Sequence, residues 1–143
     1  MRRFIILVFL CLLGAGNVFA EEFIGSIKHA QGESYLVHQG QAQTAQVGDH
    51  LYKGDVLRTG DGSLGALFRD DTAISLGPES EIAVEEFIFD PAGGNLSFLT
   101  KIFRGSAAFL TGQMGKIRPE AFRVETPQAT IGIRGTHFVV DVD

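Results

Sequence analysis

The chain has 143 residues, with 17 acidic and 12 basic side chains and a formal net charge of −5. This acidic balance, with no cluster of Lys and Arg, disfavours binding to nucleic acid, whose phosphates must be neutralised by clustered cations. The single cysteine is Cys11, which lies in a segment predicted below to be removed, so the mature chain would lack disulfides, a thiol nucleophile and a cysteine-based zinc site.

The first twenty residues have the pattern of a cleaved secretory signal. Arg2 and Arg3 precede an apolar run over 4–13, and a small-residue region ends at Ala20. Cleavage is predicted after Ala20. A membrane anchor is the alternative, but a spanning helix needs roughly 20 apolar residues, about twice the run present. We therefore expect a periplasmic or secreted chain of one domain, 21–143, with no membrane span.

From Glu21 onward the apolar residues recur in short alternating runs rather than with a helical period. Gly, Asp, Asn and Pro separate these runs about every 8 to 12 residues, which predicts an all-β domain. We expect many short strands arranged as a small β-sandwich or a β-roll-like stack. The predicted strands are 23–27, 33–37, 50–52, 55–58, 63–68, 73–76, 81–89, 96–103, 106–110, 121–125, 130–133 and 137–142, with a loop over 111–120.

The punctuation between the strands predicts specific turns. Gly54 with Asp55, and Asp70 with Asp71, are the residue types that tight turns prefer. Within 81–89 the alternation of apolar and acidic residues slips by one step, which predicts a bulge near Glu85 or Glu86.

The C-terminal stretch "TIGIRGTHF" is strand-like but interrupted by Gly132 and Gly135. Two glycines within four residues predict a bulge or a tight corner between strands. Such a bend would direct Arg134 outward to pair with a carboxylate or phosphate of a partner. The candidate binding residues are therefore Arg134, Thr136 and His137, while the flanking apolar residues are expected in the core: Ile131, Ile133, Phe138 and Val140.

The acidic and histidine residues do not form a recognisable metal or catalytic pattern. Asp49, Asp55 and Asp61 are six residues apart, whereas calcium loops need more closely spaced oxygen ligands. Glu81 and Glu85 would lie about 13 Å apart along an extended strand, which does not suit a glycosidase pair on one strand. The histidines lack zinc-site spacing. No cofactor, metal or catalytic residue is predicted.

Ordered motifs over most of the chain resemble a known family. The stretch "VGDHLYKGDVLRTGDGSLGALFRDDTAISLGPESEIAVEEF", followed by "FRGSAAF" and "RVETPQATIGIRGTHFVV", is similar to the FecR-type domain, roughly over 47–142. In sensor members this domain lies outside the membrane and docks with an outer-membrane receptor, while a cytoplasmic segment holds a sigma factor. Because a signal peptide precedes the domain here, the chain looks like the secreted, stand-alone versions, and sigma-factor signalling is not implied.

Three hypotheses follow. The first is a non-catalytic envelope module that binds a protein, an outer-membrane receptor or a second copy, through a flat face or an edge strand. The second is a carbohydrate-binding module, which is disfavoured because the chain has no Trp and only Tyr35 and Tyr52 as amphipathic stacking residues. The third, an enzyme, would need a pocket with converging acid, base or nucleophile.

Overall fold

The computed structural model describes residues 21–133 and 135–143. The predicted signal peptide and Arg134 lie outside the described residues. Within the described part the regular structure is mostly strand, with one short helix, which confirms the all-β prediction. The elements are β1 (Gly25–Gln31), β2 (Ser34–His38), β3 (Gln41–Thr44), β4 (His50–Leu51), β5 (Val56–Thr59), β6 (Ser63–Phe68), β7 (Ala73–Leu76), β8 (Glu81–Asp90), β9 (Asn95–Leu110), α1 (Gln113–Ile117), a 3-10 turn (Pro119–Ala121), β10 (Phe122–Glu125), β11 (Thr130–Gly132) and β12 (His137–Val142).

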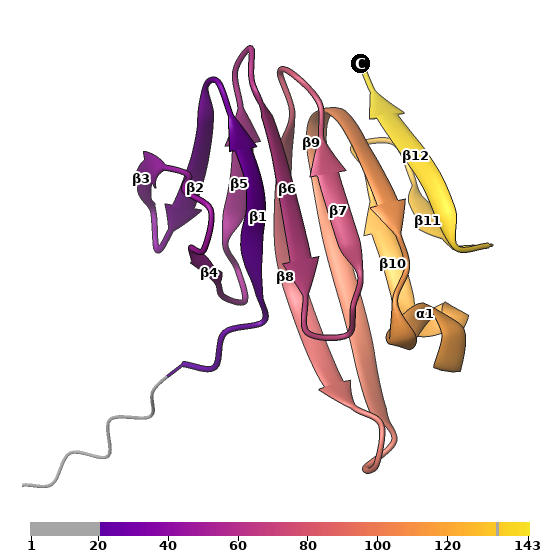
Figure 1. Cartoon of the computed structure of the whole chain (residues 1–143). Coiled ribbons are helices and arrows are strands. Elements are labelled where there is room, and N and C mark those ends of the chain that lie inside the picture. Colours follow the sequence, from indigo (N-terminus) through magenta and orange to yellow (C-terminus); the bar gives the residue numbers. More distant parts are fainter. Residues whose placement is uncertain (1–20, 134) are drawn as a thin grey trace, which may run out of the picture.

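The strands form one sheet that curls over itself into two facing layers, an open half-barrel (Figure 1). One layer has the order β4-β1-β6-β7-β9-β12, and the other has β3-β2-β5-β8-β9-β10-β11. The strand pairs are antiparallel except β9 with β10, which run parallel. A curled sheet of this kind is within the predicted range of a sandwich or a roll, because the two inner faces share one core.

Strand β9 belongs to both layers and connects them. Its first part pairs with β8 and β10, and its last part, from Gly105 onward, pairs with β7 and β12. Gly105 has φ +81°, a conformation that glycine adopts without the cost that a Cβ imposes. The two strands predicted over 96–103 and 106–110 are therefore one strand that bends, and the prediction of a break was wrong.

Hydrogen bonds of the Ser80 and Thr59 hydroxyl groups hold the bend of β9 against the turn before β8. The backbone N–H of Ser106 donates to Ser80 Oγ at 2.9 Å, and the Ser80 hydroxyl donates to the Ser106 carbonyl oxygen at 3.1 Å. The Ser80 N–H in turn donates to Thr59 Oγ1 at 3.0 Å. These bonds replace ladder bonds that the bend interrupts, and they link β5, β8 and β9 at one end of the molecule.

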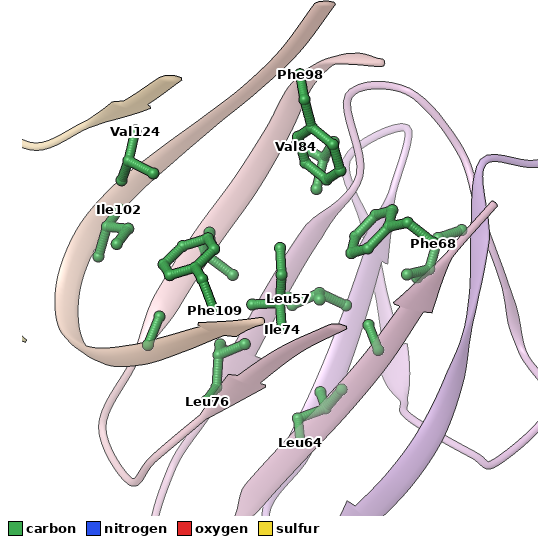
Figure 2. Close-up of a cluster of buried hydrophobic side chains, with 14 of the residues drawn as sticks. Leu57, Leu64, Phe68, Ile74, Leu76, Val84, Phe98, Ile102, Phe109 and Val124 are labelled. Carbon is green, nitrogen blue, oxygen red and sulfur yellow. The ribbon is translucent and has the colours of Figure 1, made fainter. Parts of the chain in front are cut away.

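Apolar side chains from both layers fill the space between them (Figure 2). Phe98 lies at the centre with no exposed surface. The centroid of its ring is 5.0 Å from that of Phe68 and 4.6 Å from that of Phe122. Each fully buried side chain of this size contributes about 1.5–3 kcal/mol to folding. The C-terminal residues expected in the core do contact it: Ile131, Ile133, Phe138 and Val140.

Three local features show where the sequence pattern was and was not sufficient. The register of β8 shifts between Val84 and Glu86, which confirms the predicted bulge. Strand β3 was missed, because all four of its residues are exposed and carry no alternation. The predicted loop over 111–120 instead contains α1 and a 3-10 turn, because Met114 is fully buried against the core and draws a helical turn onto it.

Replacing Gly105 with alanine tests the role of the bend. A Cβ at this position would contact Ser80 Oγ and lie 2.5 Å from the Glu79 carbonyl oxygen, at a strained φ of +81°. We expect Gly105→Ala to lower the free energy of unfolding by about 3 kcal/mol in urea titrations. Gly132→Ala is the matched control, because a Cβ there meets no described atom within 4 Å; it should change stability by less than about 0.5 kcal/mol. Equal effects would contradict this account of the bend.

Candidate interaction surface

The half-barrel is open between β11 and β12. In the described part of the chain β11 pairs with β10 alone and β12 with β9 alone, so each leaves one side unpaired. Figure 1 places both strands together at one end of the molecule, away from β3 and β4. A groove of about 410 Å³ lies there, which we call the C-terminal groove; its lining residues are Ile131, Gly132, Ile133, Phe138, Val139, Val140 and Asp141.

The six residues of β12 alternate strictly between the core and solvent. Val140 and Val142 are buried, whereas His137, Val139 and Asp141 are exposed. Val139 is 63% exposed, a high value for a large apolar side chain. An alternating strand with two adjacent valines must direct one of them outward. This Val-Val pair was the signal in the sequence that could have identified Val139, which was not predicted as a site residue.

The backbone of β12 also has a free side. The Thr136 carbonyl oxygen accepts a hydrogen bond from Thr111 N–H at 2.8 Å, which fixes the phase of the ladder with β9. Because backbone groups of successive residues point to opposite sides of a strand, the even-numbered residues of β12 pair with β9. The backbone groups of His137, Val139 and Asp141 therefore face the open side.

The outer faces of the two layers differ in charge. Across β6, β7, β9 and β12 the cross-strand row runs from Gly65 through Ser75 and Ala108 to Val139. The next row contains Leu67, Ala73, Leu110 and His137. These rows form a face of small and apolar residues, with His137 at its edge, which allows another surface to approach closely.

The opposite layer presents charged residues on its outer face. Glu81 lies between Arg58 and Arg104, with N···O distances of 3.4 Å and 3.6 Å. The glutamate considered as a possible general acid or base is thus paired with two arginines across β5, β8 and β9. This face is a solvated, ion-paired surface, and the contrast directs attention to the less charged face and to the edge of β12.

The predicted binding residues lie beside this edge. Thr136 and His137 are exposed at the start of β12, and His137 is opposite Leu110 of β9. Arg134 lies outside the described residues. Gly135 has φ +89° in the connection from β11 to β12. Gly132 ends β11 opposite Arg123 without a left-handed φ, so the proposed corner of two glycines is formed by Gly135, and no steric reason for Gly132 is found among the described atoms.

The aspartates of "VGDHLYKGDVLRTGDG" lie in separate turns. Asp49 accepts from Gln46 N–H at 2.9 Å. Asp55 is nearly buried, with one oxygen 2.5 Å from His38 Nδ1 and the other accepting from Tyr52 N–H at 2.9 Å. Gly54, with φ +88°, forms the turn before it. Within residues 21–133 and 135–143, no three His, Cys, Asp or Glu side chains are grouped as metal ligands.

The second predicted acidic turn ties the end of β6 to α1. Asp70 has no exposed surface, and its carboxylate accepts from Thr72 N–H at 3.1 Å, from the Thr72 hydroxyl at 2.8 Å and from Met114 N–H at 3.3 Å. Asp71, with φ +69°, accepts from the Gln113 side chain at 2.9 Å. A buried carboxylate with this number of donors has a structural role: it connects the turn after β6 to α1, and so holds α1 beside the groove-forming strands.

A larger pocket, of about 600 Å³, is lined by residues 21–24, Lys53, Arg69 and residues 87–90 of β8. There Phe23 stacks on His50 at 4.2 Å, and Arg69 lies over the Phe23 ring at 5.6 Å. Arg69 is also 3.3 Å from Glu22. These contacts hold residues 22 and 23 against the domain beside this pocket.

A comparison with protein-family models matches residues 55–143 to the family described as "FecR protein". This match covers most of the chain, including the turn at Asp70, the bend in β9 and the whole C-terminal groove. No curated protein and no solved structure matches the chain. Among the helices of the described residues, none has the length and apolar character that crossing a membrane requires.

The tie formed by Asp70 is testable by substitution. Asp70→Ala leaves two backbone N–H groups and the Thr72 hydroxyl without their acceptor, and we expect a loss of about 3 kcal/mol in the free energy of unfolding. Asp71→Asn, which retains the acceptor for Gln113 and tolerates a positive φ, should cost less than about 0.5 kcal/mol. Urea titration followed by circular dichroism measures both. A stable Asp70→Ala variant would show that the buried carboxylate is dispensable.

Proposed function

The chain belongs to the FecR protein family, and we propose that it acts as a non-catalytic interaction module of the bacterial cell envelope. In this proposal β12 accepts an extended segment of a partner protein as an added strand. The observation that carries the proposal is the free edge of β12 beside the apolar C-terminal groove. The predicted secretory signal and the family membership both support an envelope location.

The edge of β12 has the properties that strand addition requires. A sheet edge presents unpaired N–H and C=O groups, and proteins usually block it with lysine, proline, bulges or very short strands. β12 has six residues, contains no lysine or proline, and pairs with β9 without a register shift. By comparison, β4 has two residues and β11 has three. β12 is therefore longer than either of these two edge strands, and no lysine, proline or register shift blocks it.

The groove would provide specificity for the added strand. In β-augmentation the main-chain hydrogen bonds supply affinity, while pockets for alternate side chains select the sequence. Here an added strand would direct every second side chain toward Ile131 and Phe138, both of which are partly buried against the core. We expect the bound segment to have apolar residues at alternate positions and polar residues between them.

The surroundings of the acidic residues support binding rather than catalysis. Asp55, Asp70 and Glu81 are each engaged by neighbouring donors, so their side chains hold turns and layers together. The aromatic residues considered for carbohydrate stacking are likewise occupied, because Tyr52 packs against His38 at 5.1 Å and Tyr35 is half-buried in β2. Binding of a defined oligosaccharide on a glycan array would favour the carbohydrate-binding hypothesis over protein binding.

Proline at position 139 tests strand addition. The Val139 N–H faces the open side, so Val139→Pro removes a donor that the partner needs without removing one from the ladder with β9. We expect the variant to fold but to bind the envelope protein captured by the tagged wild-type chain at least about tenfold more weakly. Val139→Thr, which keeps the N–H and the β-branched shape, should bind normally.

The binding assay uses the purified partner after its identification by capture. Circular dichroism and the unfolding transition establish that each variant is folded. Equal affinity of wild type and a folded Val139→Pro variant would show that the partner does not add a strand to β12.

A further inference from the structure

We propose that β12 pairs with β12 of a second copy of this chain, antiparallel across a two-fold axis, with Val139 opposite Val139. This inference rests on the proposed function, because it uses the same open edge and commits it to one occupant. The product is a homodimer in which the layer β4-β1-β6-β7-β9-β12 continues into its symmetry copy as a single sheet.

The phase of the backbone fits this register. His137, Val139 and Asp141 direct their N–H and C=O groups to the open side, as the Thr136 bond to Thr111 requires. Residues that face each other with outward backbone groups form hydrogen-bonded pairs in an antiparallel ladder. With Val139 opposite itself, His137 of each copy lies opposite Asp141 of the other, and all three outward residues find partners.

The side chains on the outer face are complementary in this register. His137 and Asp141 are both exposed on the same face of β12, so the two-fold axis creates two His–Asp pairs. Each imidazole can donate a hydrogen bond to a carboxylate of the other copy, and such cross-strand pairs are favourable. A shift that places Val140 opposite itself would instead put Asp141 opposite Val139. The charge pattern therefore selects the register centred on Val139.

The apolar residues also match. Phe138, partly buried, would lie opposite Val140 of the second copy on the inner face, twice by symmetry. Val139, 63% exposed in the single chain, would pack against its own copy on the outer face. An interface in which one patch meets itself is the commonest arrangement in homodimers. Ala108 and Ser75, which continue the cross-strand row from Val139, are small and leave room for the added strand on that face.

Charge exchange tests the register. Sedimentation of the full chain should show a reversible dimer. His137→Asp sets two carboxylates opposite each other and should raise the dimer dissociation constant by about tenfold or more. The double variant His137→Asp with Asp141→Lys restores two opposite-charge pairs only if residue 137 meets residue 141, and it should recover the wild-type constant to within about threefold. A double variant as weak as the single one would overturn the register and with it the proposal.

Cysteine cross-linking provides a second, independent measurement. In a Cys11→Ser background, Val139→Cys places two thiols at a hydrogen-bonded pair with Cα atoms about 5.5 Å apart, within the range for a disulfide. Mild oxidation should therefore yield a covalent dimer. Asp141→Cys is the control, because its copies would be about 13 Å apart along the strands. Cross-linking through position 141 or 140 in place of 139 would refute the pairing.

The outcomes separate this inference from the proposed function. A wild-type chain that stays monomeric up to about 100 µM overturns self-pairing. Binding of another envelope protein is measured separately, through its loss in Val139→Pro. That loss in a strictly monomeric chain would retain the strand-addition function and reject the second copy as its occupant.

Discussion

The passage of β9 from one layer to the other at Gly105 is the constraint on which the rest of the structure depends. Sixteen residues of one strand pair with β8 and β10 before the bend and with β7 and β12 after it. Because the Ser80 hydroxyl binds both backbone groups of Ser106, the bend has a defined position. The two layers therefore share one core centred on Phe98, and neither can bury its inner face without the other.

The same constraint determines which surfaces remain available. β9 carries β7 on one side and β12 on the other, so β12 ends its layer with a free backbone side. In the opposite layer β10 and β11 follow β9, and the groove opens between the two terminal strands. Charged residues gather on the outer face that contains Glu81, whereas the face that contains Ala108 and Val139 has small and apolar residues. The less charged face and the free edge thus meet at β12, and this coincidence is the physical basis for assigning interaction to that strand.

Local patterns allowed much of this fold to be predicted from the sequence. The alternation in 63–68 and 137–142 gave the strands β6 and β12 with their bounds, and the one-step slip near Glu86 gave the bulge in β8. Features that depend on distant contacts were not accessible: α1 is held by the carboxylate of Asp70, 44 residues away in the chain. The continuity of β9 depends on Ser80, and the open edge follows from strand order. The predicted residues Thr136 and His137 lie next to the open edge of β12. Val139 could be assigned to that edge only once the direction of its backbone groups was known.

Native-state hydrogen exchange, resolved by residue, tests most directly whether β9 unites the two layers. If it does, the amides of Phe98 and Ile102 before the bend and those of Ala107 and Phe109 after it exchange with one common free energy, equal to that of global unfolding. In the same experiment the amides of Val139 and Asp141 in monomeric protein exchange much faster than that of Val140, whose N–H pairs with β9. Two distinct free energies for the two parts of β9 would contradict the account, because the layers would then unfold separately and the position of β12 would not depend on the bend.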